Sequence, residues 1–266
     1  MPNVMPIQHV SRRHGRSFKR RDALGFIGGG LMVSLLGCVR RPPASADSGE
    51  TGSQAPAPTA GQPACTVRPQ QTAGPYFVDA GLNRSDIRSD PATGSVKPGV
   101  PLTLQFQVSQ VGANGCVPLA GAMVDVWQCD ATGVYSDVVD RRANTLGQTF
   151  LRGVQVTNAD GVVEFITIYP GWYPGRTVHI HFKIRGHVAI NQGTNQGYEF
   201  TSQLYFDDAV SDRIYTQAPY SGSGQHTTRN QDDGIFRSGG GDQLMLSLTE
   251  AGEGYTGRFE IGLELA

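Results

Sequence analysis

The chain has 266 residues, of which 38% are apolar and 17% are charged, so it is long enough to bury a sizeable core in one or two domains. Its formal net charge of -1 conceals a split. Residues 1–37 hold six Lys/Arg against one acid, which leaves 16 Lys/Arg and 22 Asp/Glu, a formal charge of -6, for residues 38–266. Nucleic-acid binding needs clustered Lys/Arg, and no such cluster follows Arg41, so the composition argues against a nucleic-acid partner.

Residues 1–37 are predicted to be an export signal. The basic stretch SFKRRD (17–22) precedes an apolar run over 23–36 that is too short and too rich in glycine for a membrane-spanning helix. Its arginine pair resembles a twin-arginine signal, and LLGC (35–38) resembles a lipobox, whose cysteine would be lipidated. The sequence therefore predicts export to a bacterial cell envelope, with membrane attachment only through a lipid anchor on Cys38. An ordinary cleaved signal or an N-terminal anchor is the alternative.

Residues 38–64 are predicted to be a flexible tether. Pro, Ala, Ser, Gly and Thr dominate this stretch, which has too few large apolar side chains to bury a core. Cys65, Cys116 and Cys129 remain in the exported part. Outside the cytosol two of them are expected to form a disulfide and one to stay free, but the sequence does not choose among the three pairings.

Residues 65–266 are predicted to form an all-β domain, an antiparallel β-sandwich core with long loops. Short runs rich in β-branched and aromatic residues alternate with Gly, Pro, Asn and Asp turns, and no segment shows a sustained helical period. The clearest predicted strands cover residues 102–108, 122–128, 162–168, 178–184, 198–205, 244–248 and 258–263.

One stretch, YPGWYPGRTVHIHFKI (169–184), carries the strongest chemical signal. A Gly/Pro turn with two tyrosines and an arginine leads into a strand in which His179 and His181 share one face, because side chains two residues apart project the same way. The alternating Val, Ile, Phe and Ile side chains give the other face an apolar surface to bury. On these residues alone, half of a metal site and an exposed pair of edge-strand histidines are equally open interpretations.

Four motifs together resemble the intradiol ring-cleavage dioxygenases, the catechol and protocatechuate-type enzymes. They occur in the order of that family, and the resemblance runs from about Cys65 to the C-terminus. The motifs are QQTAGPYF (70–77), VDVWQCDATGVYS (124–136), PGWYPGRTVHIHF (170–182) and QLYF (203–206).

The resemblance implies a non-haem Fe(III) ion held by Tyr135, Tyr173, His179 and His181. Phenolate oxygen is a hard, anionic donor that suits Fe(III), while imidazole accepts either oxidation state of iron. The cation must lower the pKa of both tyrosines well below their usual value near 10. Tyr173 is expected to leave the metal when substrate binds and to take a proton, so that it acts as ligand and base in turn.

Three further positions gain roles from the resemblance. Arg176 matches an arginine near the substrate ring and would stabilise developing negative charge, although a surface ion pair is the alternative. Gln203 matches a glutamine near the iron pocket; it would bond an iron-bound hydroxide or the substrate, or else be a satisfied core amide. Tyr76, with Pro75 before it, is expected to shape the pocket wall.

Three other aromatic and imidazole side chains compete with the proposed ligands. Tyr169 lies in the same turn as Tyr173, but the ligand of the family stands a few residues before the arginine, which matches Tyr173. We therefore expect Tyr169 to be a packing residue. His187 and His226 are expected to be exposed loop histidines.

The resemblance implies an oxidoreductase that cleaves an aromatic vicinal diol of the catechol type with O2 to a muconate-type diacid. Family members often complete the pocket with a helical N-terminal segment or a partner subunit. Here only the tether precedes the domain, so a homo-oligomer is one way to complete it. The alternative function is a non-catalytic envelope lipoprotein that binds iron or iron-catecholate.

Overall fold

A computed structural model describes residues 66–113, 115–191 and 194–265 of the chain. The predicted export signal, tether and lipidated Cys38 lie outside these residues. Within the described ranges, no helix is both long enough and apolar enough to cross a membrane.

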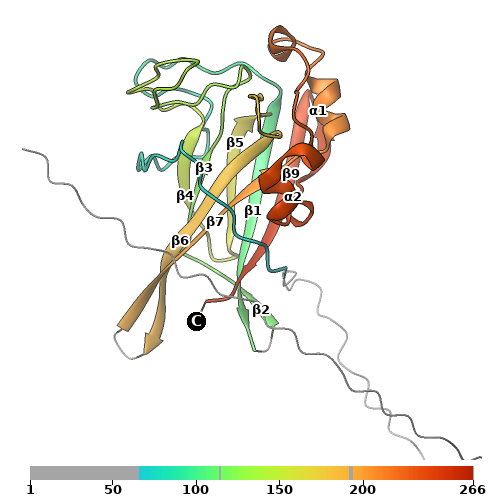
Figure 1. Ribbon diagram of the computed structural model, residues 1–266. Coiled ribbons are helices and arrows are strands. Elements are labelled where there is room, and N and C mark those ends of the chain that lie inside the picture. The colour runs from blue at the N-terminus through green and yellow to red at the C-terminus, as the bar shows by residue number, and fades with distance from the viewer. Residues whose placement is uncertain (1–65, 114, 192–193, 266) are drawn as a thin grey trace, which may run out of the picture. The chain divides into compact units, whose positions relative to one another are not determined.

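The described chain consists mainly of strands, with short helical segments between the seventh and the eighth strand in the sequence (Figure 1). The strands are β1 (Pro101–Gly112), β2 (Gly115–Pro118), β3 (Met123–Trp127), β4 (Arg152–Val156), β5 (Val162–Ile168), β6 (His179–Asn191), β7 (Thr194–Tyr205), β8 (Ser247–Ala251) and β9 (Gly254–Leu263). The helical segments are α1 (Asp208–Ile214), η1 (Tyr220–Ser223), η2 (Asn230–Asp232), α2 (Gly234–Ser238) and η3 (Gly241–Leu244).

Two sheets form the predicted sandwich. One sheet has the order β2-β1-β9-β8, with β5 also paired to β1, and the other has the order β4-β3-β6-β7. Aromatic side chains join them: the ring of Phe106 on β1 lies 5.2 Å from that of Phe182 on β6, and Phe182 lies 5.6 Å from Phe259 on β9. Fully burying one such side chain contributes about 1.5–3 kcal/mol, so this cluster fixes one sheet against the other.

The sandwich is not wholly antiparallel, which corrects the prediction. Strands β1 and β9 pair in parallel, from Leu102 opposite Tyr255 to Gln110 opposite Leu263, whereas the other strand pairs are antiparallel. Alternation along a strand shows which face is buried but not the direction of its neighbour. Parallel pairing requires a long connection, and here the intervening elements of both sheets supply it.

The predicted strand over 244–248 is wrong in its position. Leu244 ends η3, and β8 begins only at Ser247. The alternation that indicated a strand is real, since Leu244 and Leu246 are buried. These residues instead cross between the sheets: the Leu246 amide donates to the Tyr205 carbonyl at the end of β7, before the chain enters β8 in the other sheet. The other predicted strands overlap observed ones, and β2 and β4 are additional.

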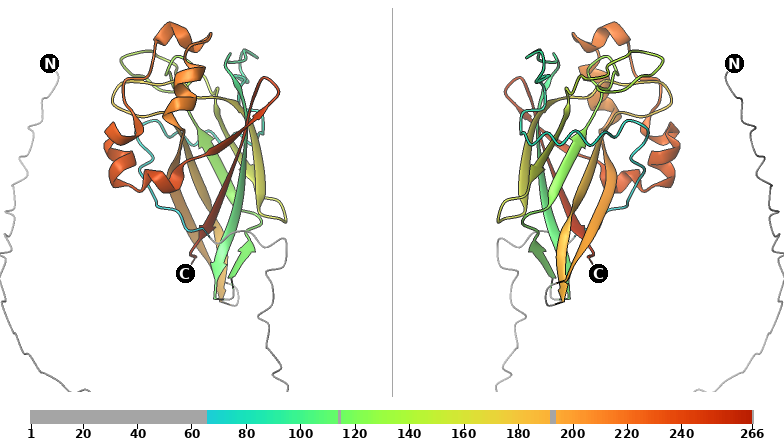
Figure 2. Two further views of the ribbon diagram at one scale, coloured as in Figure 1. Left: turned by 90° about the vertical axis from the view of Figure 1, so that its right-hand side faces the viewer. Right: turned by 90° about the vertical axis from the view of Figure 1, so that its left-hand side faces the viewer.

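The helical segments follow β7 and lie to one side of the sheets (Figure 2). Each α-helix begins at an aspartate whose carboxylate accepts backbone N–H groups of the first turn: Asp207 caps α1 and Asp233 caps α2. The two caps have different surroundings, because Asp207 is exposed and Asp233 is buried. The second cap therefore brings a carboxylate into the interior.

Candidate metal centre

The site lies on the face of the four-stranded sheet that points away from the sandwich core. Val178, Ile180 and Phe182 are buried in the core, as the alternation predicts, so His179 and His181 face the opposite way. Both histidines are nevertheless almost completely buried, with 2% and 1% of their surface exposed. Side chains from outside the strands lie against them, among them Tyr173 and Tyr135.

Four donor atoms converge at the start of β6. The Nε2 atom of His179 lies 3.1 Å from Nε2 of His181, 3.1 Å from the phenol oxygen of Tyr173 and 3.4 Å from that of Tyr135. Two donors that are each about 2.1 Å from one ion are about 3.0–3.4 Å apart when they subtend 90–110° at it. The spacing therefore fits a single cation among these four atoms.

Tyrosine is essential to this donor set. Within the described residues, no three His, Cys, Asp or Glu side chains are placed to hold a metal ion. Two imidazoles alone are too few for a closed site, so the phenols of Tyr135 and Tyr173 must supply the remaining donors. Hard anionic oxygen with nitrogen favours Fe(III) over soft ions such as Cu(I), and the residues present fit the predicted ferric ion.

Tyr135 is held by a tight turn after β3. The Asp130 carboxylate accepts the amides of Thr132 and Val134, and the turn contains Gly133 with a φ of +82°. A Cβ atom at Gly133 would lie 2.1 Å from the carbonyl oxygen of Trp172, next to Tyr173. This glycine therefore lets the two turns that carry the tyrosines approach each other.

Replacing Gly133 by Ala is expected to weaken iron binding and to lower the free energy of unfolding. An alanine in the left-handed conformation costs roughly 1–2 kcal/mol. The loss at position 133 is expected to be larger, because the turn must also move away from Trp172. Gly147 provides the matched control, since its φ is +80° and nothing lies within 4 Å of its Cβ position. Denaturant unfolding and iron titration of both variants check this. Equal losses in G133A and G147A would contradict the close approach.

Both histidines are neutral, which is the form that binds metals. Burial lowers the pKa of His179 to about 3 and that of His181 well below its usual value. The Nδ1–H group of His179 donates to the carbonyl of Thr177 at 2.6 Å, so its Nε2 lone pair faces the other donors. The His181 ring stacks on the Trp127 indole with ring centres 4.9 Å apart and planes 1° apart. Backbone and aromatic contacts thus fix both ring orientations.

The two phenols are protonated unless a cation is present. Burial, above all, raises the pKa of Tyr135 and of Tyr173 above the usual value of 10. An adjacent Fe(III) ion acts in the opposite direction and favours phenolate. Tyr135 is 1% exposed, whereas Tyr173 is only partly buried, so Tyr173 is the phenol with more room to move.

Arg176 points into the site as part of a polar network. Its Nε donates to Asp233 at 2.8 Å, and its Nη2 donates to the side-chain oxygen of Gln203. Gln203 also accepts from the Tyr205 hydroxyl at 3.2 Å and donates to the Thr72 carbonyl at 3.0 Å. The Gln203 amide is thus a satisfied core group, the second of the two roles considered for it. The partner of Arg176 is the buried Asp233, not a surface acid.

Tyr76 lies against the site from the N-terminal segment. Its ring stacks on that of Tyr135 with centres 4.4 Å apart and meets the ring of Tyr173 edge-on at 6.2 Å. The Tyr76 hydroxyl donates to Asp140 at 3.3 Å. The expected wall residue therefore contacts both tyrosines, whereas its neighbour Pro75 is exposed.

The structure separates the competing side chains from the site. Tyr169 is buried, and its hydroxyl bonds to Ser211 at 2.7 Å, in agreement with a packing role. His187 is exposed as expected, but it lies in β6 and not in a loop. His226 was wrongly expected to be exposed: it is 4% exposed and lies 3.2 Å from Asp212. Sequence alone gives no sign of this contact, because Asp212 belongs to α1.

Comparisons with known proteins show the family of the chain. The model of the dioxygenase family, described as Dioxygenase, matches residues 72–231, more than half of the chain. The chain is also similar to a solved intradiol ring-cleavage dioxygenase from Tetranychus urticae, with 30% identity and a TM-score of 0.63 over 75% of this chain and 95% of that one. The chain belongs to the intradiol ring-cleavage dioxygenases. Members of this family are oxidoreductases.

The chain is also similar to two further proteins. It is 31% identical to the dioxygenase domain of a carbohydrate-binding fusion protein from Streptomyces sp. SirexAA-E, with a TM-score of 0.50 over 76% of this chain and 100% of that one. It is 34% identical over 126 residues to the protocatechuate 3,4-dioxygenase beta chain of Burkholderia cepacia, which is 44% of this chain and 51% of that one. The chain spans about half the length of the curated relatives it matches.

Two of the three cysteines considered lie within the described residues, and they differ in state. Cys116 is disulfide-bonded, and Cys129 is a free thiol. Cys129 is buried beside Trp127 and Tyr135, and its thiol donates to the Gly171 carbonyl at 3.4 Å. Burial raises the pKa of this thiol far above its usual value, so Cys129 is an inert packing residue at the base of the site.

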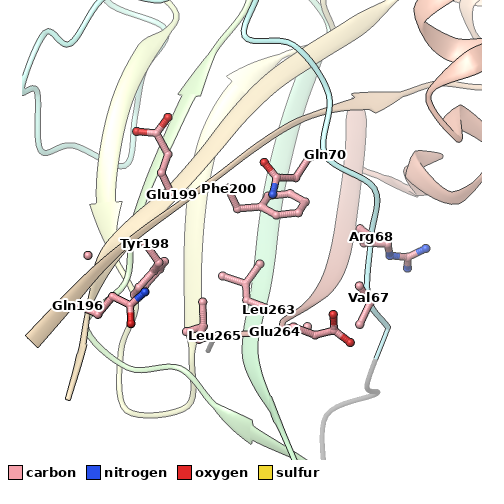
Figure 3. Close-up of a pocket in the computed structure, with 12 residues that line it drawn as sticks. Val67, Arg68, Gln70, Gln196, Tyr198, Glu199, Phe200, Leu263, Glu264 and Leu265 are labelled. Atoms are coloured by element: carbon pink, nitrogen blue, oxygen red, sulfur yellow. The ribbon is translucent and has the colours of Figure 1, made fainter. Parts of the chain in front are cut away.

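A cavity of about 380 Å³ lies apart from the metal centre (Figure 3). It is lined by the N-terminal segment at Val67 and Arg68, by β7 at Tyr198 and Phe200, and by Leu263 at the end of β9. None of the predicted site residues lines it. The cavity is therefore separate from the candidate metal centre.

Proposed function

We propose that this chain is a non-haem Fe(III)-dependent intradiol dioxygenase that cleaves a catechol-type vicinal diol with O2 to a muconate-type diacid. The observation that supports this most is the convergence of four side chains: the donor atoms of Tyr135, Tyr173 and His181 each lie 3.1–3.4 Å from Nε2 of His179. Two phenols and two neutral imidazoles form a donor set that suits Fe(III). When bound, the ferric ion would activate a chelated diol toward O2.

Tyr173 has the position to exchange protons with the substrate. It is partly exposed, whereas Tyr135 is buried beneath Tyr76, so Tyr173 is the phenol that an incoming diol would reach with less rearrangement. Its buried surroundings raise the pKa of the phenol. A released Tyr173 phenolate is therefore a strong base, able to take a proton from a diol hydroxyl.

Arg176 would stabilise negative charge that develops on the bound ring. Burial lowers the pKa of Arg176, but the phenolate form of Tyr173 and the Asp233 carboxylate more than offset this, and the pKa lies above its usual value. The guanidinium is thus a permanent cation with an orientation fixed by Asp233 and Gln203. Fixed charge in a site that excludes water is an effective way to stabilise a transition state.

The wild-type protein itself tests the proposal. Loaded with Fe(III), it is expected to be wine-red from tyrosinate-to-iron charge transfer, to change its spectrum when a catechol is added and to consume O2. An oxygen electrode, a panel of substituted catechols and product identification measure these outcomes. A colourless protein with full iron occupancy would exclude tyrosinate ligation. Colour without turnover on any diol would instead favour the iron-binding lipoprotein.

A further inference from the structure

The Asp233 carboxylate accepts more hydrogen bonds than a helix cap requires. One carboxylate oxygen, Oδ1, accepts the amides of Ile235 and Phe236 at 2.7 and 3.2 Å and so begins α2. The other, Oδ2, accepts Nε of Arg176 at 2.8 Å and the Thr177 amide at 2.9 Å. The Asp233 side chain is 1% exposed, so all four bonds lie away from water.

One set of contacts from Asp233 leads to Arg176, the positively charged side chain of the site. Asp233 holds one edge of the Arg176 guanidinium, and Gln203 holds another. Gln203 is in turn anchored on the Thr72 carbonyl. Arg176 is thereby clamped between the segment that carries α2 and strand β7, and its direction does not depend on a substrate.

A second set of contacts leads to a predicted metal ligand. Thr177 donates its amide to Asp233, and its hydroxyl bonds to the side-chain oxygen of Asn230 at 2.6 Å. The carbonyl of the same Thr177 accepts Nδ1–H of His179. Hydrogen bonds to the far nitrogen of a ligating histidine fix its tautomer and its ring orientation.

We propose that Asp233 is a positioning residue, whose carboxylate fixes both the Arg176 guanidinium and, through Thr177, the tautomer and orientation of His179. This inference rests on the function proposed above. Burial would raise the pKa of Asp233, but the Thr177 amide and the Arg176 charge more than offset it, and the pKa lies below its usual value. The carboxylate is therefore charged at neutral pH and matches the charge of Arg176.

Replacing Asp233 by Asn isolates this role. Asparagine caps helices as well as aspartate does, so its oxygen keeps the bonds to α2. Its amide nitrogen then faces two donors, Arg176 Nε and the Thr177 N–H, and cannot accept from either. Asp207→Asn is the matched control, because Asp207 caps α1 through the Ala209 and Val210 amides and is exposed.

We expect D233N to lower kcat by about 10- to 100-fold and to shift the charge-transfer band, whereas D207N leaves both unchanged. In iron-free protein, nitrogen NMR is expected to show the Nδ1–H tautomer of His179 in the wild type and in D207N, and a mixture of tautomers in D233N. Unchanged kcat and an unchanged His179 tautomer in D233N would overturn the proposal.

Two measurements keep this test separate from the proposed function and from folding. Wild-type protein that turns over no diol would refute the dioxygenase function, and the His179 tautomer in iron-free variants would still decide the role of Asp233. If D233N does not fold, the Nε–H of Arg176 in wild-type iron-free protein decides. Slow hydrogen exchange of this proton, as for a buried charged hydrogen bond, supports the proposal. Exchange at the rate of a solvated guanidinium overturns it.

Discussion

Iron-loaded Tyr173→Phe is expected to lose at least about 100-fold in kcat and to lose part of its visible absorption. Phenylalanine removes both an anionic ligand and the group that takes a proton from the diol, and a positioned proton acceptor contributes about 10²–10⁴-fold. The phenylalanine ring would keep the edge-on contact that Tyr173 makes with Tyr76, so the packing of the site is preserved. Stopped-flow turnover and the absorption spectrum of the same sample measure both effects.

Tyr169→Phe is the matched control for this experiment, because it removes a hydroxyl from the same turn. Among the residues that the structure describes, the Tyr169 hydroxyl bonds to Ser211 alone, and Ser211 also donates to the Asp207 carbonyl. We expect Y169F to keep its colour and its kcat and to lose about 1 kcal/mol of stability, the usual net value of one hydrogen bond. Bleaching in Y169F together with full colour in Y173F would show that the ligand in this turn has been misassigned.

Arg176→Lys is expected to lower kcat by about 10²–10³-fold, which is the loss found when one preorganised donor to a developing charge is removed. Lysine keeps the positive charge near Asp233, and with it most of the ion pair. It lacks the planar guanidinium that bonds Asp233 and Gln203 at once, so the charge no longer has a fixed direction. Steady-state kinetics with a good diol substrate measure the loss as a fall in kcat.

Arg185→Lys controls for the general effect of removing a guanidinium from this sheet. Arg185 lies on β6, the strand that follows Arg176, and it pairs with Asp79 at 2.7 Å and with Asp125 at 2.9 Å, away from the donor atoms. R185K is expected to change stability slightly and kcat not at all. A similar fall in kcat for R185K and R176K would mean that Arg176 acts through the stability of the sheet, not through its charge in the site.

Local patterns predicted the part of the site that a single strand determines. The alternation from Val178 to Ile184 was enough to place His179 and His181 on one face, and the structure shows this arrangement. The proximity of Tyr135 and Tyr173 was expected only from the resemblance to a family. No local pattern relates these residues, because the approach of their turns depends on Gly133 and the Trp172 carbonyl.

The rest of the site depends on contacts between residues far apart in the chain. Asp233 reads in the sequence as an ordinary cap before a short helix, and only the fold brings it to Arg176. Gln203 illustrates the same limit, since its strand was predicted but its hydrogen-bond partners were not. His226 lies in a loop but is buried, and its contacts with Asp212 and Arg229 depend on how the loop folds back on α1.

The parallel pairing of β1 with β9 has a consequence for how the domain folds. Strand β9, which is synthesised last among the described strands, is an interior strand of its sheet, with β1 on one side and β8 on the other. Chain segments that are distant in sequence must meet before this sheet closes, and such high contact order makes folding slow. A nascent chain that lacks β9 therefore exposes the apolar face of Phe106, and the sandwich forms only after synthesis has reached its final strand.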